Sequence, residues 1–303
     1  MKRAAAALAA LLLLGTAAAA ENAEEIYRRA VTVLGEATRE SHRADGAALV
    51  ARAAEMGLAA AQVHLATLYA EGTILPLDKG RAMEWFHRAA QQGHPTAQYA
   101  AGLAQMAAGD RRGAADWFRR AAEQGQTDAR FQLALLLEKG DGVPRNEAEA
   151  RRLYAQAAEQ KDTASMMNLA LMLDEGRGGP ADLNAAIGWY VRAAEAALPE
   201  AMHALCEILL DGRGVEADPE KAAGWCRAAA DRGHAPSQLL LATLHALGNG
   251  VAIDEVRAAA WLILAAKSGF PPAVKARDEL VPGLPPDTRR KAEALSNTLV
   301  PTN

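Results

Sequence analysis

The amino-acid sequence predicts an all-α protein, a solenoid of stacked helical hairpins, and two observations support this. The first is composition: half of the 303 residues are apolar, only 5% are aromatic, and alanine recurs throughout. Alanine is the best helix former because it loses no side-chain entropy and buries no polar group. The second is a repeat, since WFHRAAQQG at 85–93 returns as WFRRAAEQG at 117–125. No stretch shows the sustained β-branched alternation that is typical of strands.

The repeat continues along most of the chain at a nearly constant period. The equivalent positions are Trp85, Trp117, Leu153, Trp189, Trp225 and Trp261, separated by 32 residues once and by 36 thereafter. An alanine pair follows each of them, and a glycine closes most of the segments. A fixed period in this range indicates stacked supersecondary units.

Each repeat also has a first helix, as in AQVHLATLYAEG at 61–72, where small or apolar residues share one helical face. A glycine such as Gly72 ends it by supplying a left-handed conformation. The second helix carries the tryptophan and the alanine pair. We expect alanine to let the helices approach closely and tryptophan to fill the gap between neighbouring hairpins. A single hairpin cannot bury its own apolar face, so the hairpins must stack.

The repeats AQVHLATLYAEG…DKGRAMEWFHRAAQQG and AMHALCEILLDGRGVEADPEKAAGWCRAAADRG closely resemble Sel-1-like repeats, which are related to tetratricopeptide repeats. The loops GDGV, GRGV and GNGV match the G-x-G-V loop of that family. The resemblance covers six copies over 61–270 and implies a right-handed α/α superhelix of about sixteen helices. Repeat two lacks four residues of the loop, Leu153 replaces tryptophan in repeat three, and GRGGP replaces the loop motif in repeat four.

The two ends of the chain are predicted to cap the repeats. Over 21–60 we expect a degenerate repeat, with a polar helix over 22–43 and a second helix that begins at Leu49. Over 271–303 we expect C-terminal capping helices, because prolines break the chain there and a helix can restart after Pro286.

Residues 1–20 have the features of a secretory signal peptide. A basic head, MKR, precedes a short apolar run over 4–14 and then small residues. This run is too short to span a bilayer, which takes about 20 residues, although an N-terminal membrane anchor is the alternative. We expect cleavage after Ala20, no integral membrane segment in the mature chain, and a periplasmic or secreted location.

The charge balance argues against nucleic acid as a partner. The full chain has 37 acidic and 33 basic residues, and loss of Lys2 and Arg3 would make the mature chain more acidic still. No basic stripe of the kind that neutralises phosphates is present.

Motifs for catalysis or metal binding are absent from the sequence. None of the seven histidines forms a metal-type pair, and H-E-x-x-H, G-x-S-x-G and S-x-x-K do not occur. The G-x-G-V loops follow helices and lack the third glycine of a dinucleotide-binding loop. We therefore predict no catalytic residue, no cofactor and no metal site.

Two cysteines occur, and both lie in repeat five. Cys206 takes a contact position of the first helix and Cys226 follows Trp225 in the second, so an antiparallel hairpin would place them at similar heights. In an oxidising compartment they could form a disulfide. The alternative is that they are two small buried apolar residues.

Binding is the activity that the sequence favours. By analogy with tetratricopeptide solenoids, first helices line the concave face, and their outward positions are apolar in repeats two to four. The candidate groove residues are Tyr99, Leu103, Met106, Phe131, Leu135, Met167 and Leu171. The positions that correspond to Tyr99 and Leu103 in repeats five and six are His203, Glu207, Leu239 and Thr243. An exposed apolar strip indicates an interaction site; the alternative is that Tyr99 and Phe131 are partly packed.

Two functions follow, both with support from the resemblance. The first is a non-enzymatic periplasmic scaffold, an adaptor or regulator, that binds a protein or peptide of the cell envelope in the groove. The second is an envelope hydrolase, because cysteine-rich members of the family are described as β-lactamases. Those members carry a cysteine pair in most repeats, whereas this chain has two cysteines in all.

Overall fold

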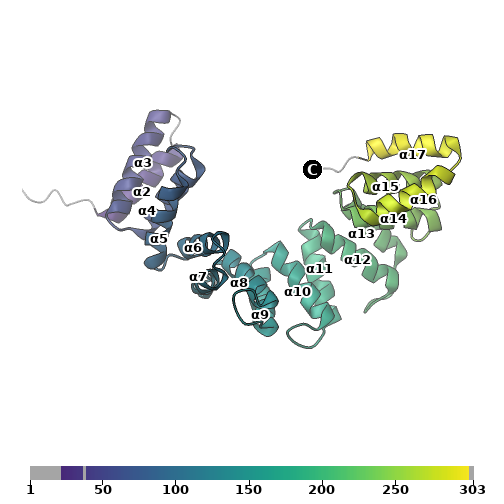
Figure 1. The fold of residues 1–303 in the computed structure, drawn as a ribbon, viewed down its shortest axis with the longest axis horizontal. Coiled ribbons are helices and arrows are strands. Elements are labelled where there is room, and N and C mark those ends of the chain that lie inside the picture. The colour runs from purple at the N-terminus through teal and green to yellow at the C-terminus, as the bar shows by residue number, and fades with distance from the viewer. Residues whose placement is uncertain (1–21, 37–38, 300–303) are drawn as a thin grey trace, which may run out of the picture. The chain divides into compact units, whose positions relative to one another are not determined.

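The computed structural model describes residues 22–36 and 39–299, and the regular structure in these ranges is entirely helical (Figure 1). It comprises sixteen α-helices and one 3-10 helix, which confirms the predicted all-α class. The signal peptide and the cleavage after Ala20 lie outside the described residues. None of the helices within the described ranges combines the length and the apolar character that crossing a bilayer requires.

The helices are short, and most have 13 residues. Those before repeat three are α2 (Ala23–Glu36), α3 (Glu40–Glu55), α4 (Ala59–Glu71), α5 (Lys79–Gln91), α6 (Pro95–Ala107) and α7 (Arg111–Glu123). Repeats three to six contain α8 (Thr127–Lys139), α9 (Glu147–Glu159), α10 (Thr163–Glu175), α11 (Leu183–Glu195), α12 (Pro199–Asp211), α13 (Pro219–Ala230), α14 (Ala235–Leu247) and α15 (Glu255–Lys267). The chain continues with α16 (Pro271–Leu280), the 3-10 helix (Val281–Gly283) and α17 (Pro286–Thr298).

The described residues form two compact units, with the boundary along the chain in repeat three: residues up to 136 and 140–144 belong to the first, and residues 137–139 and those from 145 onward belong to the second. In the first unit, the helices from α2 to α7 pack against one another in chain order. In the second, those from α9 to α15 do so, and α16 and α17 both pack against α15. A first helix therefore contacts the second helix of its own repeat and that of the preceding one, as stacked hairpins must to bury their apolar faces.

The alanine pairs of the second helices lie at the centre of these contacts, as the repeat predicts. Ala89 and Ala90 in α5 are buried, and so are Ala193 and Ala194 in α11. The short side chain brings the backbones of neighbouring helices together and loses little conformational entropy on burial.

The tryptophan is half-buried in four of the five repeats that carry it, and only Trp261 is buried. Trp117 and Trp189 are half-buried, whereas the next residues, Phe118 and Tyr190, are fully buried. Phe118 and Tyr190 each lie three and four residues before the two alanines of the pair, so they point to the same face of the helix as the pair. The tryptophan lies at the edge of that face. The guanidinium of Arg192 covers the open side of Trp189, 4.0 Å from the ring centroid.

Each second helix of repeats one to six begins with an acid or amide that caps it. The carboxylate or amide oxygen accepts a hydrogen bond from the backbone N–H three residues later, which contributes about 1 kcal/mol per helix. The capping residues are Asp78, Asp110, Asn146, Asp182, Asp218 and Asp254.

The second glycine of the loop motif is required by the stacking of the repeats. Gly178 and Gly250 have φ of 71° and 70°, which L-residues rarely adopt. A Cβ atom would overlap the backbone carbonyl of Glu147 at the first position and that of Pro219 at the second. The loop can therefore reach the start of the preceding second helix only with glycine at this place.

The predicted N-terminal boundaries are wrong. The helix expected over 22–43 ends at Glu36, and the second helix begins at Glu40, nine residues before Leu49. The early restart lets Gly46 lie against Leu34, where a Cβ atom would overlap the leucine side chain. Close packing of α3 on α2 accounts for the difference, and the repeat over 21–60 is too degenerate for the other copies to reveal it.

Candidate functional site

The candidate groove residues lie on α6, α8 and α10, and none of the seven is fully buried. Leu103 is 41% exposed and the other six are half-buried. Those on α6 follow one another at intervals of four and three residues, which places them on one side of the helix. The residues of α6 and α8 belong to the first unit, whereas Met167 and Leu171 belong to the second.

Tyr99 is partly packed, which is one of the two alternatives that the sequence left open. Its ring centroid lies 5.8 Å from that of the buried Phe118, so one face of the ring packs on the core of the repeat. Burial raises the pKa of Tyr99; Asp128 adds to this rise, and a hydrogen bond with Gln132 opposes it. Both of these neighbours belong to α8, so Tyr99 links the first helices of repeats two and three.

Leu103 and Met106 are therefore the better candidates for a contact with a partner in the first unit. Leu103 is the most open of the set, and the backbone carbonyl of Met106 is held by the Arg111 guanidinium at 2.6 Å. Its side chain is half-buried. The structure thus presents an apolar face on α6, with Tyr99 as its packed edge.

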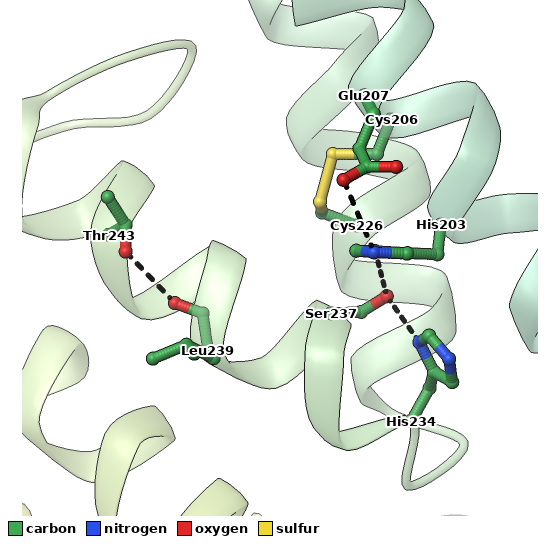
Figure 2. The surroundings of a disulfide bond; sticks show 8 residues. All are labelled: His203, Cys206, Glu207, Cys226, His234, Ser237, Leu239 and Thr243. Atoms are coloured by element: carbon green, nitrogen blue, oxygen red, sulfur yellow. Dashed lines mark hydrogen bonds and ion pairs between the residues drawn. A yellow bond between two sulfur atoms is a disulfide. The ribbon is translucent and has the colours of Figure 1, made fainter. Parts of the chain in front are cut away.

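Cys206 and Cys226 form a disulfide between α12 and α13 (Figure 2). Their Cα atoms are 5.4 Å apart, and both side chains are fully buried. The bond joins the two helices of repeat five. Because neither sulfur is accessible, the pair has a structural rather than a reactive environment.

A polar chain that the sequence did not predict lies beside the disulfide (Figure 2). The Oγ atom of Ser237 is 2.8 Å from Nδ1 of His234 and 3.0 Å from Nδ1 of His203. Nε2 of His203 lies 3.6 Å from a carboxylate oxygen of Glu207. Four polar side chains from α12, from α14 and from the turn between α13 and α14 thus form one row.

One assignment of protons is compatible with every contact of this row. His203 carries its proton on Nε2 toward Glu207, Ser237 donates to His203 Nδ1, and His234 Nδ1–H donates to Ser237. Burial lowers the pKa of His203. Burial also lowers the pKa of His234, with a further contribution from His203, and raises that of Glu207. Burial therefore favours the neutral form of both rings.

The order carboxylate, imidazole, hydroxyl is that of a hydrolytic triad, but the environment differs. Ser237 is fully buried, so a substrate cannot reach its hydroxyl, and the hydroxyl lies between two rings. The arrangement can fix the position of α14 against α12; it offers no surface on which to bind a carbonyl compound.

Comparison of the repeats could have revealed this row. Ser237 occupies the position of Ala97 and Ala201 in the repeat, and His203 occupies that of Tyr99. A polar residue at a buried alanine position needs a partner, and His203 was available in the preceding repeat. Within residues 22–36 and 39–299, no three histidine, cysteine, aspartate or glutamate side chains are placed to hold a metal ion.

A comparison with known families finds six copies of one repeat. The family model described as Sel1 repeat matches residues 59–94, 95–126, 127–162, 163–198, 199–234 and 235–270. This confirms the resemblance seen in the sequence. Sel1 repeat proteins are generally non-enzymatic scaffolds for protein–protein interaction. No curated protein matches the chain.

Solved structures share the fold, and two of them serve as examples. One is c5321, a protective antigen present in uropathogenic Escherichia coli strains that displays an SLR fold; it aligns with a TM-score of 0.80 and 28% identity over 92% of this chain. This chain covers only 61% of that protein's length. The other is a Sel1 repeat protein from Oxalobacter formigenes, with a TM-score of 0.54 and 29% identity over 89% of this chain and 90% of that one.

Proposed function

Because the chain belongs to the Sel1 repeat family, we propose that it is a non-enzymatic periplasmic scaffold, an adaptor or regulator that binds a protein or peptide of the cell envelope on its first helices. The observation that carries the proposal is the apolar face of α6, where Leu103 is 41% exposed beside the half-buried Tyr99 and Met106. Such a face suits the apolar side of a helix or an extended peptide. The signal-like residues 1–20 support export.

Affinity capture from the bacterial envelope tests this proposal with a charge placed on the apolar face. Leu103→Asp should lose the captured partner, because binding would bury an unpaired carboxylate. The fold should tolerate the change, since repeat five already has Glu207 at the equivalent position. Thr67→Asp, the same position of repeat one, is the matched control. If wild type and Leu103→Asp capture the same proteins, the α6 face is not the binding site.

The double variant Tyr99→Ser with Phe131→Ser separates binding from packing. Circular dichroism should show a folded protein that has lost its partner. If the protein unfolds, these two side chains belong to the core, and Leu103 with Met106 would be the remaining contact.

The alternative function is a β-lactamase-like hydrolase. The row formed by Glu207, His203 and Ser237 gives it a specific candidate nucleophile, but Ser237 is fully buried. We expect no turnover of nitrocefin by the purified protein. Turnover that Ser237→Ala abolishes, in a variant that still folds, would establish the hydrolase instead.

A further inference from the structure

A cavity of about 380 Å³ lies in the second unit, between α14, α15, α16 and the 3-10 helix that follows. This is near the lower end of the volumes of ligand pockets, about 300–1,000 Å³. Its walls are built mainly of leucine, alanine and valine side chains. Leu247 and Leu280 line it and are 70% and 61% exposed, although each is large and apolar. None of the candidate groove residues contributes to it.

The wall of the cavity offers almost no polar group to a ligand. Its one hydroxyl, that of Thr243, donates a hydrogen bond to the backbone carbonyl of Leu239 at 3.1 Å, within α14 (Figure 2). The one charged side chain is that of Glu255, in the first turn of α15. The nearby Arg257 pairs with Asp254 at 3.2 Å rather than with Glu255. The cavity therefore combines an apolar interior with a carboxylate.

We propose that this cavity binds an aliphatic side chain of a partner protein, in a segment that has a lysine or arginine next to that side chain. The inference rests on the proposed protein-binding function and adds the chemistry of one contact to it. The aliphatic group removes the apolar wall and the two exposed leucines from water, which is the main source of favourable free energy. The neighbouring cation pairs with Glu255 and sets the direction of the segment.

A lipid chain fits these features less well. Glu255 at the cavity would repel the anionic headgroup of a lipid whose chain entered it. A second copy of the chain would have to supply both an aliphatic residue and a cation. These two occupants are distinguished from the proposed one by the experiment.

The probe is a displayed library of random heptapeptides, selected on the full-length mature protein. Selected peptides should share an aliphatic residue with lysine or arginine within two positions. A synthetic consensus peptide should bind wild type, and Ala246→Phe, which fills the cavity from an exposed position, should weaken binding about tenfold or more. Ala70→Phe is the matched control, because Ala70 occupies the same position in repeat one and is also exposed; it should leave the affinity unchanged.

A second pair of variants tests the chemistry without filling the cavity. Leu280→Ser removes one exposed leucine and should also weaken binding. Glu255→Gln should weaken the consensus peptide about threefold, and the loss should shrink as the salt concentration rises. Circular dichroism checks that each variant folds.

Several results would overturn the inference. Equal selection by wild type and Ala246→Phe, or a consensus rich in acidic residues, would show that the cavity does not take this segment. Saturable binding of lauric acid that Ala246→Phe abolishes would assign it to acyl chains, and a dimer that Ala246→Phe dissociates would assign it to a second copy. If wild type selects the expected peptides yet captures no envelope protein, the proposed function fails and the cavity's specificity stands. If Leu103→Asp loses an envelope partner but no peptide is selected, the proposed function stands and the specificity proposed for the cavity fails.

Discussion

Two turns of the molecule have the same backbone conformation and differ in the chemistry of their side chains. In the His94 turn, residues 93–97 of the first unit, the chain passes from α5 to α6; in the His234 turn, residues 233–237 of the second, it passes from α13 to α14. Each turn begins with a glycine of positive φ and places histidine at the N-cap. His234 Nδ1 has Ser237 Oγ at 2.8 Å. His94 Nδ1 is buried with no hydrogen-bond partner among the described residues, and Ala97 occupies the place of the serine.

In a third turn, the one before α10, it is the serine and not the N-cap residue that lacks a hydrogen-bond partner among the described residues. In repeat four the N-cap is Asp162, whose carboxylate accepts the backbone N–H of Ser165, and the hydroxyl of Ser165 is buried with no partner in the described part of the chain. In these three turns, which all lie within the described residues, the buried polar side chain has a hydrogen-bond partner only where the N-cap is histidine and the residue three positions later is serine. The repeated backbone thus tolerates side-chain changes that cost stability, which leaves these positions free to vary between copies.

The largest effect should come from the disulfide that lies beside the His234 turn and has no equivalent in the His94 turn. Replacing both cysteines, Cys206→Ala with Cys226→Ala, should lower the free energy of unfolding by about 3 kcal/mol, because the bond closes a loop of 20 residues. Hydrogen exchange should rise in α12 and α13 and stay unchanged in α5 and α6. The protein has to be produced under oxidising conditions, so that the bond can form. Two reactive thiols in the denatured, unreduced protein would mean that no disulfide forms.

The next largest effect should follow from Ser237→Ala. It removes a hydroxyl that lies within 3.0 Å of two histidine nitrogens and leaves both without their partner, at a cost of about 2 kcal/mol. Urea denaturation followed by hydrogen exchange in α14 measures it. Ser165→Ala is the control at the same repeat position, and it should cost nothing or stabilise the protein, because its hydroxyl has no partner to lose. Equal losses in both variants would show that the row of histidines contributes nothing.

Adding a serine at the equivalent position of the His94 turn should stabilise the protein. Ala97→Ser introduces the hydroxyl that the His234 turn has and should raise the free energy of unfolding by about 1 kcal/mol. Ala97 is fully buried, so the new oxygen must fit in a packed site. A lower urea midpoint would mean that the room for the hydroxyl at Ser237 is itself a feature of repeat six.

Part of this structure could be predicted from the amino-acid sequence. The alanine pairs and glycines recur at one period, and each copy supports the others, so the helical hairpins could be predicted. The pairing of Cys206 with Cys226 was foreseeable as one of two alternatives, because both lie in one hairpin and their heights follow from helical spacing. The boundary between α2 and α3 was not, because the repeat over 21–60 is too degenerate to compare with the other copies.

The functional features were harder to predict because they depend on neighbours from other repeats. Ser237 acquires its role from His203, which lies in the preceding repeat. The cavity near Glu255 depends on where α16 leaves α15, and this cannot be read from a repeat pattern that ends before α16. The apolar face of α6 was predicted, but the packing of Tyr99 on Phe118 came only from the structure.

A smaller effect concerns the first residue of the turn. Ala197 has φ of 67° where the His94 and His234 turns have glycine. Ala197→Gly should stabilise the protein by about 0.5–1 kcal/mol, because the left-handed conformation is strained for alanine and not for glycine. Gly93→Ala is the mirror test, since a Cβ atom there has nothing within 4 Å and only the backbone conformation is affected. It should lower the urea midpoint; if it does not, the positive φ carries no strain.

The smallest effect per residue should be the response of the His94 turn to pH, because water partly screens a half-buried ring. Burial lowers the pKa of His94 below its ordinary value of about 6.5. The unfolded chain therefore takes up the proton more readily than the folded one, so stability is complete above about pH 6.5 and is lost as the pH falls toward the folded-state pKa. His94→Asn keeps a side chain that can cap α6 but cannot titrate, so its urea midpoint should fall less than that of wild type between about pH 7.5 and pH 5. His87→Asn, at an exposed ring, should follow wild type. Parallel curves for all three proteins would show that the fold does not hold the His94 ring neutral, and that the buried nitrogen of this turn costs nothing to protonate.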